Sequence, residues 1–176
     1  MSNTAKKHKA DAPKELRFGI FTCSTSRYGQ LKKGKKVEDP SGDIIESLLK
    51  NAGQTVVFRR LVSDDPSMIS EGMKEAIHRI DVDIVIFCGG TGIAPSDLTI
   101  ETVTPFLDKT LPGFGEIFRH LSYDEIGSAA VMSRAIAGVA KGKAVFCIPG
   151  SPNAAQLGIS RIILPEAGHI VKHARE

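Results

Sequence analysis

The chain has 176 residues, of which 41% are hydrophobic and 24% charged, with a formal net charge of +3. This length and composition are typical of one soluble globular domain that can bury a proper core. No apolar stretch approaches the roughly 18 to 20 residues needed to span a bilayer, so we expect no membrane association and a cytoplasmic location.

Basic residues are concentrated near the amino terminus. Residues 1–15 are polar, lysine-rich and without hydrophobic periodicity, which predicts a disordered basic tail ahead of a domain over residues 16–176. Such a tail is more often solvated than bound to nucleic acid, so no nucleic-acid partner is expected. Five further cations are predicted to share one short loop: Arg27, Lys32, Lys33, Lys35 and Lys36. This cluster either attracts a phosphate-bearing ligand or forms a solvated surface.

The first half of the chain alternates predicted strands and helices. Apolar or β-branched runs predict strands over 17–23, 55–62 and 83–88, and apolar residues at helical spacing predict helices over 41–51 and 66–80. A β-α-β-α-β order implies right-handed crossovers. We therefore expect an α/β fold with a mostly parallel, doubly wound sheet in three α/β/α layers.

The second half is less regular. Helices are predicted over 99–107, 113–121 and 154–164, and the chain is expected to finish as a short helix against the sheet. Residues 131–139 and 143–148, joined by a glycine-containing turn, are predicted to be a strand pair.

Three cysteines, Cys23, Cys88 and Cys147, each lie at or near the end of an apolar run. Their odd number and wide spacing argue against a disulfide framework and against a zinc site. We predict that they are small buried hydrophobic residues rather than nucleophiles. Their shared position indicates that three strands end at one rim of the sheet.

Two glycine-containing turns follow predicted strands. One is Gly89-Gly90-Thr91-Gly92 and the other is Pro149-Gly150-Ser151. Glycine lets backbone N–H groups approach an anion closely, so both turns could cradle phosphates at the carboxyl edge of the sheet. The first lacks the Lys-Ser/Thr ending of a P-loop and the spacing of a dinucleotide fingerprint, and a purely structural turn remains the alternative.

Carboxylates follow two of the same strands. Asp97 comes just after the first glycine turn, and Asp64 and Asp65 follow the second strand. Mg²⁺ typically binds one or two carboxylates together with phosphate oxygens, so converging aspartates would suit phosphoryl or nucleotidyl transfer. The alternative is helix capping, because Asp65 precedes Pro66 and Asp97 precedes a predicted helix.

Several separate motifs together resemble one family. They are Ser24-Thr25-Ser26-Arg27, Asp39-Pro40-Ser41-Gly42, Gly89–Asp97 with Thr99 and Glu101, Pro112-Gly113-Phe114-Gly115-Glu116, Ser133-Arg134-Ala135 and Pro149-Gly150-Ser151-Pro152. In order and spacing, from about Arg17 to Leu164, they resemble the MoaB/Mog family of molybdenum-cofactor biosynthesis proteins, related to the G domains of gephyrin and plant Cnx proteins.

The resemblance implies an α/β fold that assembles as a homotrimer or hexamer and binds molybdopterin and ATP. In active members, Mg²⁺-dependent transfer of AMP from ATP to the terminal phosphate of molybdopterin releases pyrophosphate, and the product passes to a molybdenum-insertion protein. Asp64 and Asp97 match family aspartates, to which we assign catalysis and Mg²⁺ binding. Cofactor-binding positions carried over are Gly89, Gly90, Thr91, Gly92 and Ser151, and more loosely Ser24, Ser26 and Arg27.

The chain also departs from the Mog pattern. It has Ser96 where many Mog-type members have an arginine before the aspartate, and Ile100 where they have a proline. Loss of that cation could weaken ATP binding or transfer its role to Arg27, Lys32 or Lys33. The pattern therefore favours the MoaB branch. The alternative to an adenylyltransferase is a noncatalytic molybdopterin carrier or scaffold, and either molybdenum or tungsten could be the final metal.

Overall fold

The computed structural model describes residues 12–176, so most of the predicted tail over residues 1–15 lies outside the described residues. Within them a six-stranded sheet has the strand order β2-β1-β3-β6-β5-β4. The strands are β1 (Arg17–Cys23), β2 (Thr55–Val62), β3 (Ile84–Cys88), β4 (Lys109–Thr110), β5 (Ile136–Ala140) and β6 (Lys143–Ile148). The first four in this order run parallel, whereas β5 and β4 are antiparallel to their neighbours.

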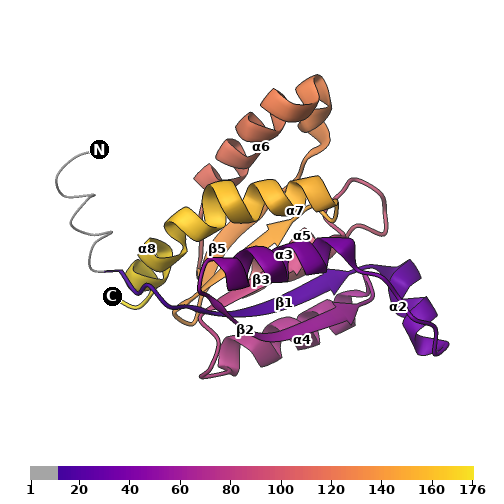
Figure 1. The fold of residues 1–176 in the computed structure, drawn as a ribbon, viewed down its shortest axis with the longest axis horizontal. Helices are drawn as coiled ribbons and strands as arrows, with labels where there is room; N and C mark the ends of the chain where they lie inside the picture. Colours follow the sequence, from indigo (N-terminus) through magenta and orange to yellow (C-terminus); the bar gives the residue numbers. More distant parts are fainter. Residues whose placement is uncertain (1–11) are drawn as a thin grey trace.

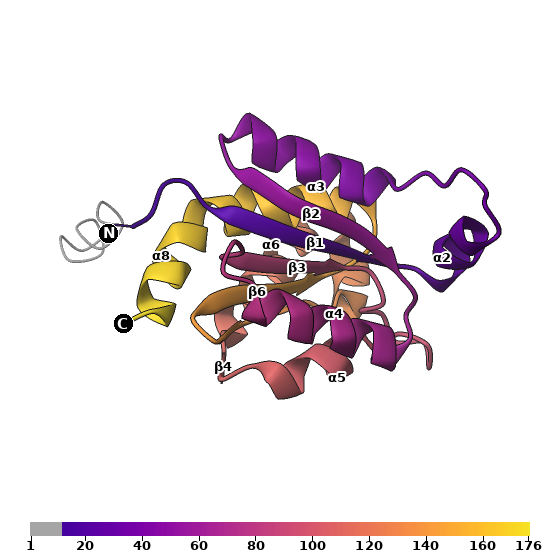
Figure 2. The ribbon, with the colours of Figure 1, turned by 90° about the horizontal axis from the view of Figure 1, so that it is seen from below.

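Helices cover both faces of the sheet, as the three layers of Figure 2 show. The α-helices of the described residues are α2 (Thr25–Lys32), which lies beyond the strand ends, α3 (Pro40–Asn51), α4 (Pro66–His78), α5 (Thr99–Val103), α6 (Pro112–Ile126), α7 (Pro152–Gly158) and α8 (Leu164–Ala174). Helices α4 and α5 lie on one face, and α3 and α7 lie on the other (Figures 1 and 2). The predicted three-layer fold with a mostly parallel sheet is confirmed.

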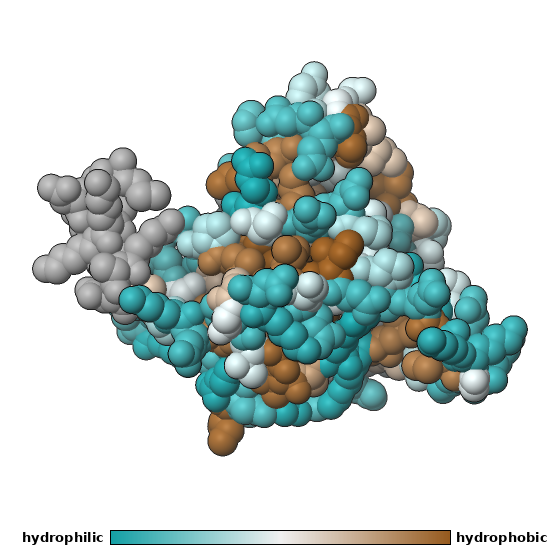
Figure 3. Space-filling view, viewed as in Figure 1, coloured by the Kyte–Doolittle hydropathy of each residue, from teal (hydrophilic) through white to brown (hydrophobic). Residues whose placement is uncertain are grey.

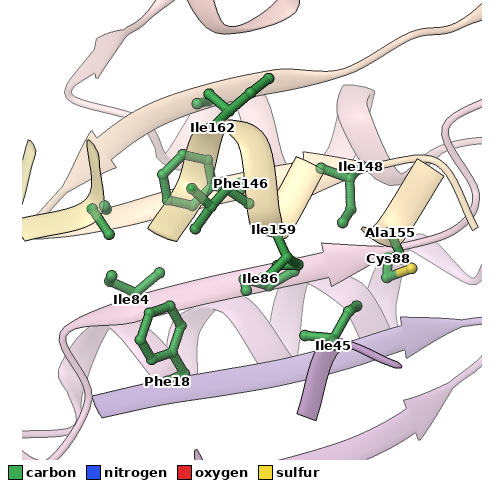
Figure 4. Packing of buried hydrophobic residues seen from close by; sticks show 14 of the residues in the cluster. Phe18, Ile45, Ile84, Ile86, Cys88, Phe146, Ile148, Ala155, Ile159 and Ile162 are labelled. Carbon is green, nitrogen blue, oxygen red and sulfur yellow. The ribbon is translucent and has the colours of Figure 1, made fainter. Parts of the chain in front are cut away.

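The core explains why the strands are continuously apolar. Successive residues of a strand point to opposite faces, and in β3 Ile84 and Ile86 enter one buried cluster while Val85 and Phe87 enter the other. Figure 4 shows the first cluster, where residues of β1, β3 and β6 meet Ile45 of α3 and the helical segment after α7. Both faces of β3 are therefore shielded from solvent, and all five of its residues are buried.

Helix starts follow the capping residues in the sequence. Asp39, Asp65 and Ser151 precede the prolines that begin α3, α4 and α7, and each side chain accepts a hydrogen bond from a backbone N–H group of the first turn. Proline suits this position because an N–H group in the first turn has no acceptor within the helix, so the lack of one in proline costs no hydrogen bond. These caps fix where each helix leaves the rim of the sheet.

Several sequence-based predictions were wrong in detail. The five cations do not share one loop, because Arg27 and Lys32 lie on α2, whose weakly apolar sequence gave no helical signal. Residues Gly127–Met132 form a 3₁₀ segment, so the predicted strand over 131–139 begins only at Ile136. The helix predicted over 99–107 ends earlier, with a 3₁₀ turn over Thr104–Phe106.

The carboxyl-terminal helices form a nearly unbroken run. Helix α7 continues through a π-helical segment, Ile159–Ile163, into α8. No helix within residues 12–176 combines the length and the apolar character required to cross a bilayer.

Candidate active site

A cavity of about 590 Å³ lies at the carboxyl ends of the parallel strands. It is lined by the whole of the first glycine turn, by residues that follow β1, β2 and β6, and by residues near the end of α6. Cys88 of β3 pairs with Thr22 of β1 and with Ile148 of β6, so three strands end side by side at this rim, as the cysteine pattern predicted. The cavity is thus a product of the sheet topology.

The glycine turn depends on backbone conformations that favour glycine. Gly89 has φ +107° and Gly90 has φ +60°, and a Cβ on Gly89 would lie 2.3 Å from the carbonyl oxygen of Cys23. The turn is held by the N–H of Gly89, which donates to Ile148, and by the N–H of Thr99, which donates to Gly90. Close packing against β1 and α5 therefore requires glycine here.

Asp64 is fixed at the cavity by α2. Its Oδ2 atom accepts hydrogen bonds from the backbone N–H (2.8 Å) and the hydroxyl (2.9 Å) of Thr25. Its Oδ1 atom is buried without a hydrogen-bond partner, as is Oγ1 of Thr99, and both atoms would lie within 2.6 Å of a Cβ on Gly90. Buried polar atoms normally have partners, so this pair next to the turn has an unused capacity to bind a cation or a donor.

Asp97 lies beside the other end of the turn. Its Oδ2 atom accepts the N–H of Ala94 at 2.9 Å and would lie 2.6 Å from a Cβ on Gly92. The capping alternative does not hold for Asp97, because Leu98 is the N-cap residue of α5. It holds for Asp65, which caps α4, whereas Asp64 and Asp97 both line the cavity.

The segment after β1 contributes polar groups and one cation. Ser24 and Ser26 face each other with their hydroxyl oxygens 3.4 Å apart, and both line the cavity together with Arg27. Lys32 and Lys33, at the far end of α2, are not among the lining residues. Of the cations considered as replacements for an arginine at Ser96, the structure brings only Arg27 to the cavity.

A second cation, Arg134, was missed as a site residue although it belongs to one of the recognised motifs. It lines the cavity, and its Nη1 atom donates to the carbonyl of Gly92 at 3.0 Å. Its Nη2 atom pairs closely with Glu101 in the first turn of α5. Burial alone would raise the pKa of Glu101, but the hydrogen bond from Arg134 outweighs burial and lowers it, which favours the carboxylate form of Glu101. Met132 and Ser133 complete this wall.

Cys23 is the cysteine that lines the cavity, yet it is poorly suited to nucleophilic attack. Burial raises its pKa to about 12. Burial also raises the pKa of Cys88 to about 12 and that of Cys147 well above its ordinary value. Because the thiolate is the reactive form, the three side chains act as small buried hydrophobic groups, as predicted.

The second glycine turn reaches the cavity through Pro149 and Gly150. The hydroxyl of Ser41 on α3 donates to the carbonyl of Gly150 at 2.6 Å and so anchors the turn. Ser151 is not among the lining residues, and its hydroxyl accepts the N–H of Ala154 at 3.2 Å as the cap of α7. Of the ten predicted site residues, nine therefore meet at one cavity and Ser151 lies just beside it.

Comparison with known proteins relates the chain to one family. Residues 19–169 match the family described as "Probable molybdopterin binding domain". The chain is 45% identical over 170 residues to molybdenum cofactor biosynthesis protein B of Halalkalibacterium halodurans, covering 96% of both chains. It is 42% identical to a molybdopterin adenylyltransferase of Pyrococcus furiosus, covering 97% of this chain and 98% of that one.

The same relationship is visible in solved structures. The crystal structure of the tungsten cofactor synthesizing protein MoaB from Pyrococcus furiosus superposes with a TM-score of 0.82 at 42% identity, covering 94% of this chain and all of that one. The family match over residues 19–169 includes both glycine turns and both cavity aspartates. The chain belongs to the molybdopterin-binding domain family of molybdenum-cofactor biosynthesis proteins.

Proposed function

We propose that this protein is a molybdopterin adenylyltransferase, which transfers AMP from ATP to the terminal phosphate of molybdopterin and releases pyrophosphate. The observation that supports it best is the convergence of Asp64 and Asp97, from separate loops, on one cavity with the Gly89–Gly92 turn. The name of the Pyrococcus furiosus relative specifies this activity. The relatives include proteins of both molybdenum and tungsten cofactor synthesis, so either molybdenum or tungsten can be the final metal of the cofactor.

The proposed reaction joins two anions. An oxygen of the terminal phosphate of molybdopterin attacks the α-phosphorus of ATP, a new P–O bond forms, and the bond from the α-phosphorus to the bridging oxygen of pyrophosphate breaks. Such in-line transfer depends on positioning and charge neutralisation rather than on a covalent nucleophile. Arg27 and Arg134 supply positive charge at the cavity, and the backbone N–H groups of the glycine turn supply neutral donors.

Asp64 and Asp97 suit a bound Mg²⁺ ion. The ion prefers oxygen ligands and commonly takes one or two carboxylates together with phosphate oxygens. The unpartnered Oδ1 of Asp64 and Oγ1 of Thr99 fit that donor type. Mg²⁺ would neutralise charge on the phosphates, while Thr25 keeps the Asp64 carboxylate oriented through its two hydrogen bonds.

The proposal includes self-association into trimers. Apolar side chains are exposed along α6 and the 3₁₀ segment that follows it, including Tyr123, Ile126 and Val131, the last of which is 81% exposed. Figure 1 shows α6 projecting from the body of the fold, and Figure 3 shows apolar residues exposed among hydrophilic ones on this projecting part. Several exposed apolar side chains on one projecting element are typical of a protein interface, and Ile126 also lines the cavity.

Pyrophosphate release tests the proposed reaction. Protein incubated with ATP, Mg²⁺ and molybdopterin should release pyrophosphate, and no release should occur without the pterin. Asp97→Asn should lower the rate by about 10² to 10³-fold, the range found when one charge-stabilising group is removed. Asp65→Asn is the matched control, because asparagine caps helices as well as aspartate does and Asp65 does not line the cavity.

The rival function is a noncatalytic molybdopterin carrier. The observation that favours it is Ser96, which leaves the position before Asp97 without the cation of Mog-type sequences. A carrier would bind the pterin with a measurable affinity but would release no pyrophosphate at any Mg²⁺ concentration.

A further inference from the structure

Helix α2 and the loop that follows it form a basic arm, residues 25–36, that extends beyond the carboxyl ends of the strands (Figure 2). The arm contains no carboxylate, and its cations are Arg27, Lys32, Lys33, Lys35 and Lys36. The chain as a whole has a formal net charge of only +3, so the residues outside the arm are together net acidic. The arm therefore carries more net positive charge than the entire chain.

The charges of the arm are not used by the fold. Helix α2 has no buried residue, and the four lysines of the arm are exposed. Within residues 12–176 none of the five cations forms an ion pair, whereas Arg59 on the neighbouring strand β2 contacts three carboxylates. The ammonium of Lys32 lies 5.3 Å from the centroid of the Tyr28 ring, which leaves it open to solvent. The positive charges are thus available to a ligand that approaches from outside.

The base of the arm is attached at the cavity. Thr25 binds Asp64 through two hydrogen bonds, and Arg27 lines the cavity. An α-helix rises 1.5 Å per residue, so the backbone of Lys32 lies about 7.5 Å further along α2 than that of Arg27. This separation is close to the Debye length of about 8 Å at physiological ionic strength. The lysines therefore lie outside the cavity, but their field reaches its mouth.

The cavity lining has no net positive charge of its own to attract a polyanion. Its charged side chains are two arginines and two aspartates, Arg27, Arg134, Asp64 and Asp97. Arg134 is in addition paired with Glu101. Both substrates of the proposed reaction carry phosphate groups, so their long-range attraction has to come from charges outside the lining.

We propose that the basic arm steers the phosphate-bearing substrates, ATP and molybdopterin, into the cavity and so sets their association rates. The inference rests on the proposed function, from which it takes the two substrates. A concentration of one sign of charge at a cleft raises association rates by about 10 to 10³-fold, and salt screens the effect. Steering requires charge at the right place and no fixed contact, so the shape of the side chains is unimportant.

Association kinetics of ATP labelled with a fluorophore on its ribose test the arm, and parallel measurements follow molybdopterin. The first variant replaces the four lysines of the arm together: Lys32→Gln, Lys33→Gln, Lys35→Gln and Lys36→Gln. At about 0.01 M ionic strength its association rate should be about tenfold below that of the wild type. The dissociation rate should be nearly unchanged, as is usual for charges at the rim of a site. At about 1 M salt, where the Debye length is about 3 Å, the two association rates should converge.

Two further variants separate steering from other effects. Replacement of the same four lysines by arginine keeps the charge and should leave the association rate at the wild-type value. A matched control removes the same total charge from exposed lysines that do not line the cavity: Lys14→Gln, Lys74→Gln, Lys109→Gln and Lys141→Gln. At about 0.1 M ionic strength, where charges more than about 10 Å away are largely screened, the control should differ little from the wild type. Unfolding temperatures should agree among all variants, because none of these lysines is buried.

The proposal is overturned if the glutamine variant associates with both ligands as fast as the wild type at low salt. It is also overturned if the arginine variant is as slow as the glutamine variant, because charge alone would then not account for the rate. These outcomes are distinct from those of the proposed reaction. Wild-type protein that binds both ligands but releases no pyrophosphate contradicts adenylyl transfer and leaves the test of the arm intact. If ATP does not bind at all, the association rate of molybdopterin decides the role of the arm.

Discussion

Thr25 donates two hydrogen bonds to a single carboxylate oxygen of Asp64, one from its backbone and one from its hydroxyl. Both bonds reach Oδ2, so Oδ1 is left buried and unpartnered beside the glycine turn. The first residue of α2 thus orients a carboxylate that follows β2, 39 residues later in the chain. Asp64 therefore presents a charged oxygen beside the glycine turn, while Thr25 only orients that carboxylate.

Asp64→Asn and Thr25→Val should therefore differ in their effects. Asp64→Asn removes the negative charge and should lower the kcat of pyrophosphate release by about 10²-fold or more. Thr25→Val removes the hydroxyl, which donates to Oδ2 of Asp64 and accepts the N–H of Asp64, but it keeps the backbone donor. A loss of about tenfold is expected, the order of one ordinary hydrogen bond. Thr25→Ser should restore the rate. A wild-type kcat in Asp64→Asn would remove this aspartate from the mechanism.

Gly90→Ala should damage both stability and activity. The added Cβ would lie 2.4 Å from Oγ1 of Thr99 and 2.6 Å from Oδ1 of Asp64, in a backbone conformation with φ +60°. Left-handed backbone alone costs a residue with a Cβ about 1–2 kcal/mol, so denaturant unfolding should show a loss of at least that size. Gly113→Ala is the control, because its Cβ would meet nothing within 4 Å. Equal stability of the two variants would contradict the assigned strain.

Arg134→Lys should weaken the use of ATP although it keeps the charge. The guanidinium bridges the carbonyl of Gly92 and the carboxylate of Glu101, and a lysine ammonium cannot reproduce this forked contact. We expect kcat/KM for ATP to fall by about tenfold, the equivalent of one charge-assisted hydrogen bond. Arg161→Lys, at an exposed position in the π-helical segment, should have no effect. Unchanged kinetics for Arg134→Lys would show that the bridge has no role in ATP use.

Asp83 should make the stability of the protein sensitive to acid. Burial alone would raise its pKa, but hydrogen bonds from Arg17 and Arg175 outweigh burial and hold the pKa well below its usual range. A depressed carboxyl pKa stabilises the fold above the unfolded-state value of about 3.9 and loses that contribution as the pH falls toward the folded-state value. Asp83→Asn should cost about 1–3 kcal/mol at pH 7.

Denaturant unfolding from pH 7 to pH 3 tests this sign. The stability difference between wild type and Asp83→Asn should be constant from pH 7 to about pH 5 and should shrink below about pH 4, where the unfolded chain binds the proton first. A difference that grows on acidification would contradict the direction of the pKa shift.

Much of the fold was predictable because the strands are buried on both faces. The runs at Arg17–Cys23 and Thr55–Val62 were predicted to the residue, and β3 began one residue later than expected. Sequence patterns were less informative for elements whose structure depends on packing against distant segments. Helix α2 has no buried residue and little apolar periodicity, so no sequence pattern predicted it.

The composition of the cavity was also largely predictable. Parallel strands end at one edge, so residues that follow β1, β2 and β3 had to lie near one another. Arg134 was not assigned to it, because it follows a 3₁₀ segment whose position depends on how α6 packs. The separation of Asp64 from its neighbour Asp65 was predicted, because Asp65 precedes Pro66 and was expected to cap a helix, as it does.

The sequence by itself determined the alternation of strands and helices in the first half, the family, and the residues that could carry charge at the carboxyl rim, because hydrophobic periodicity and glycine turns are local properties. Only the tertiary structure decided which carboxylate oxygen stays unpartnered, which arginines reach the cavity, and that the base of the basic arm is bound to Asp64. Those outcomes depend on side-chain distances between segments far apart in the chain, which no local pattern encodes.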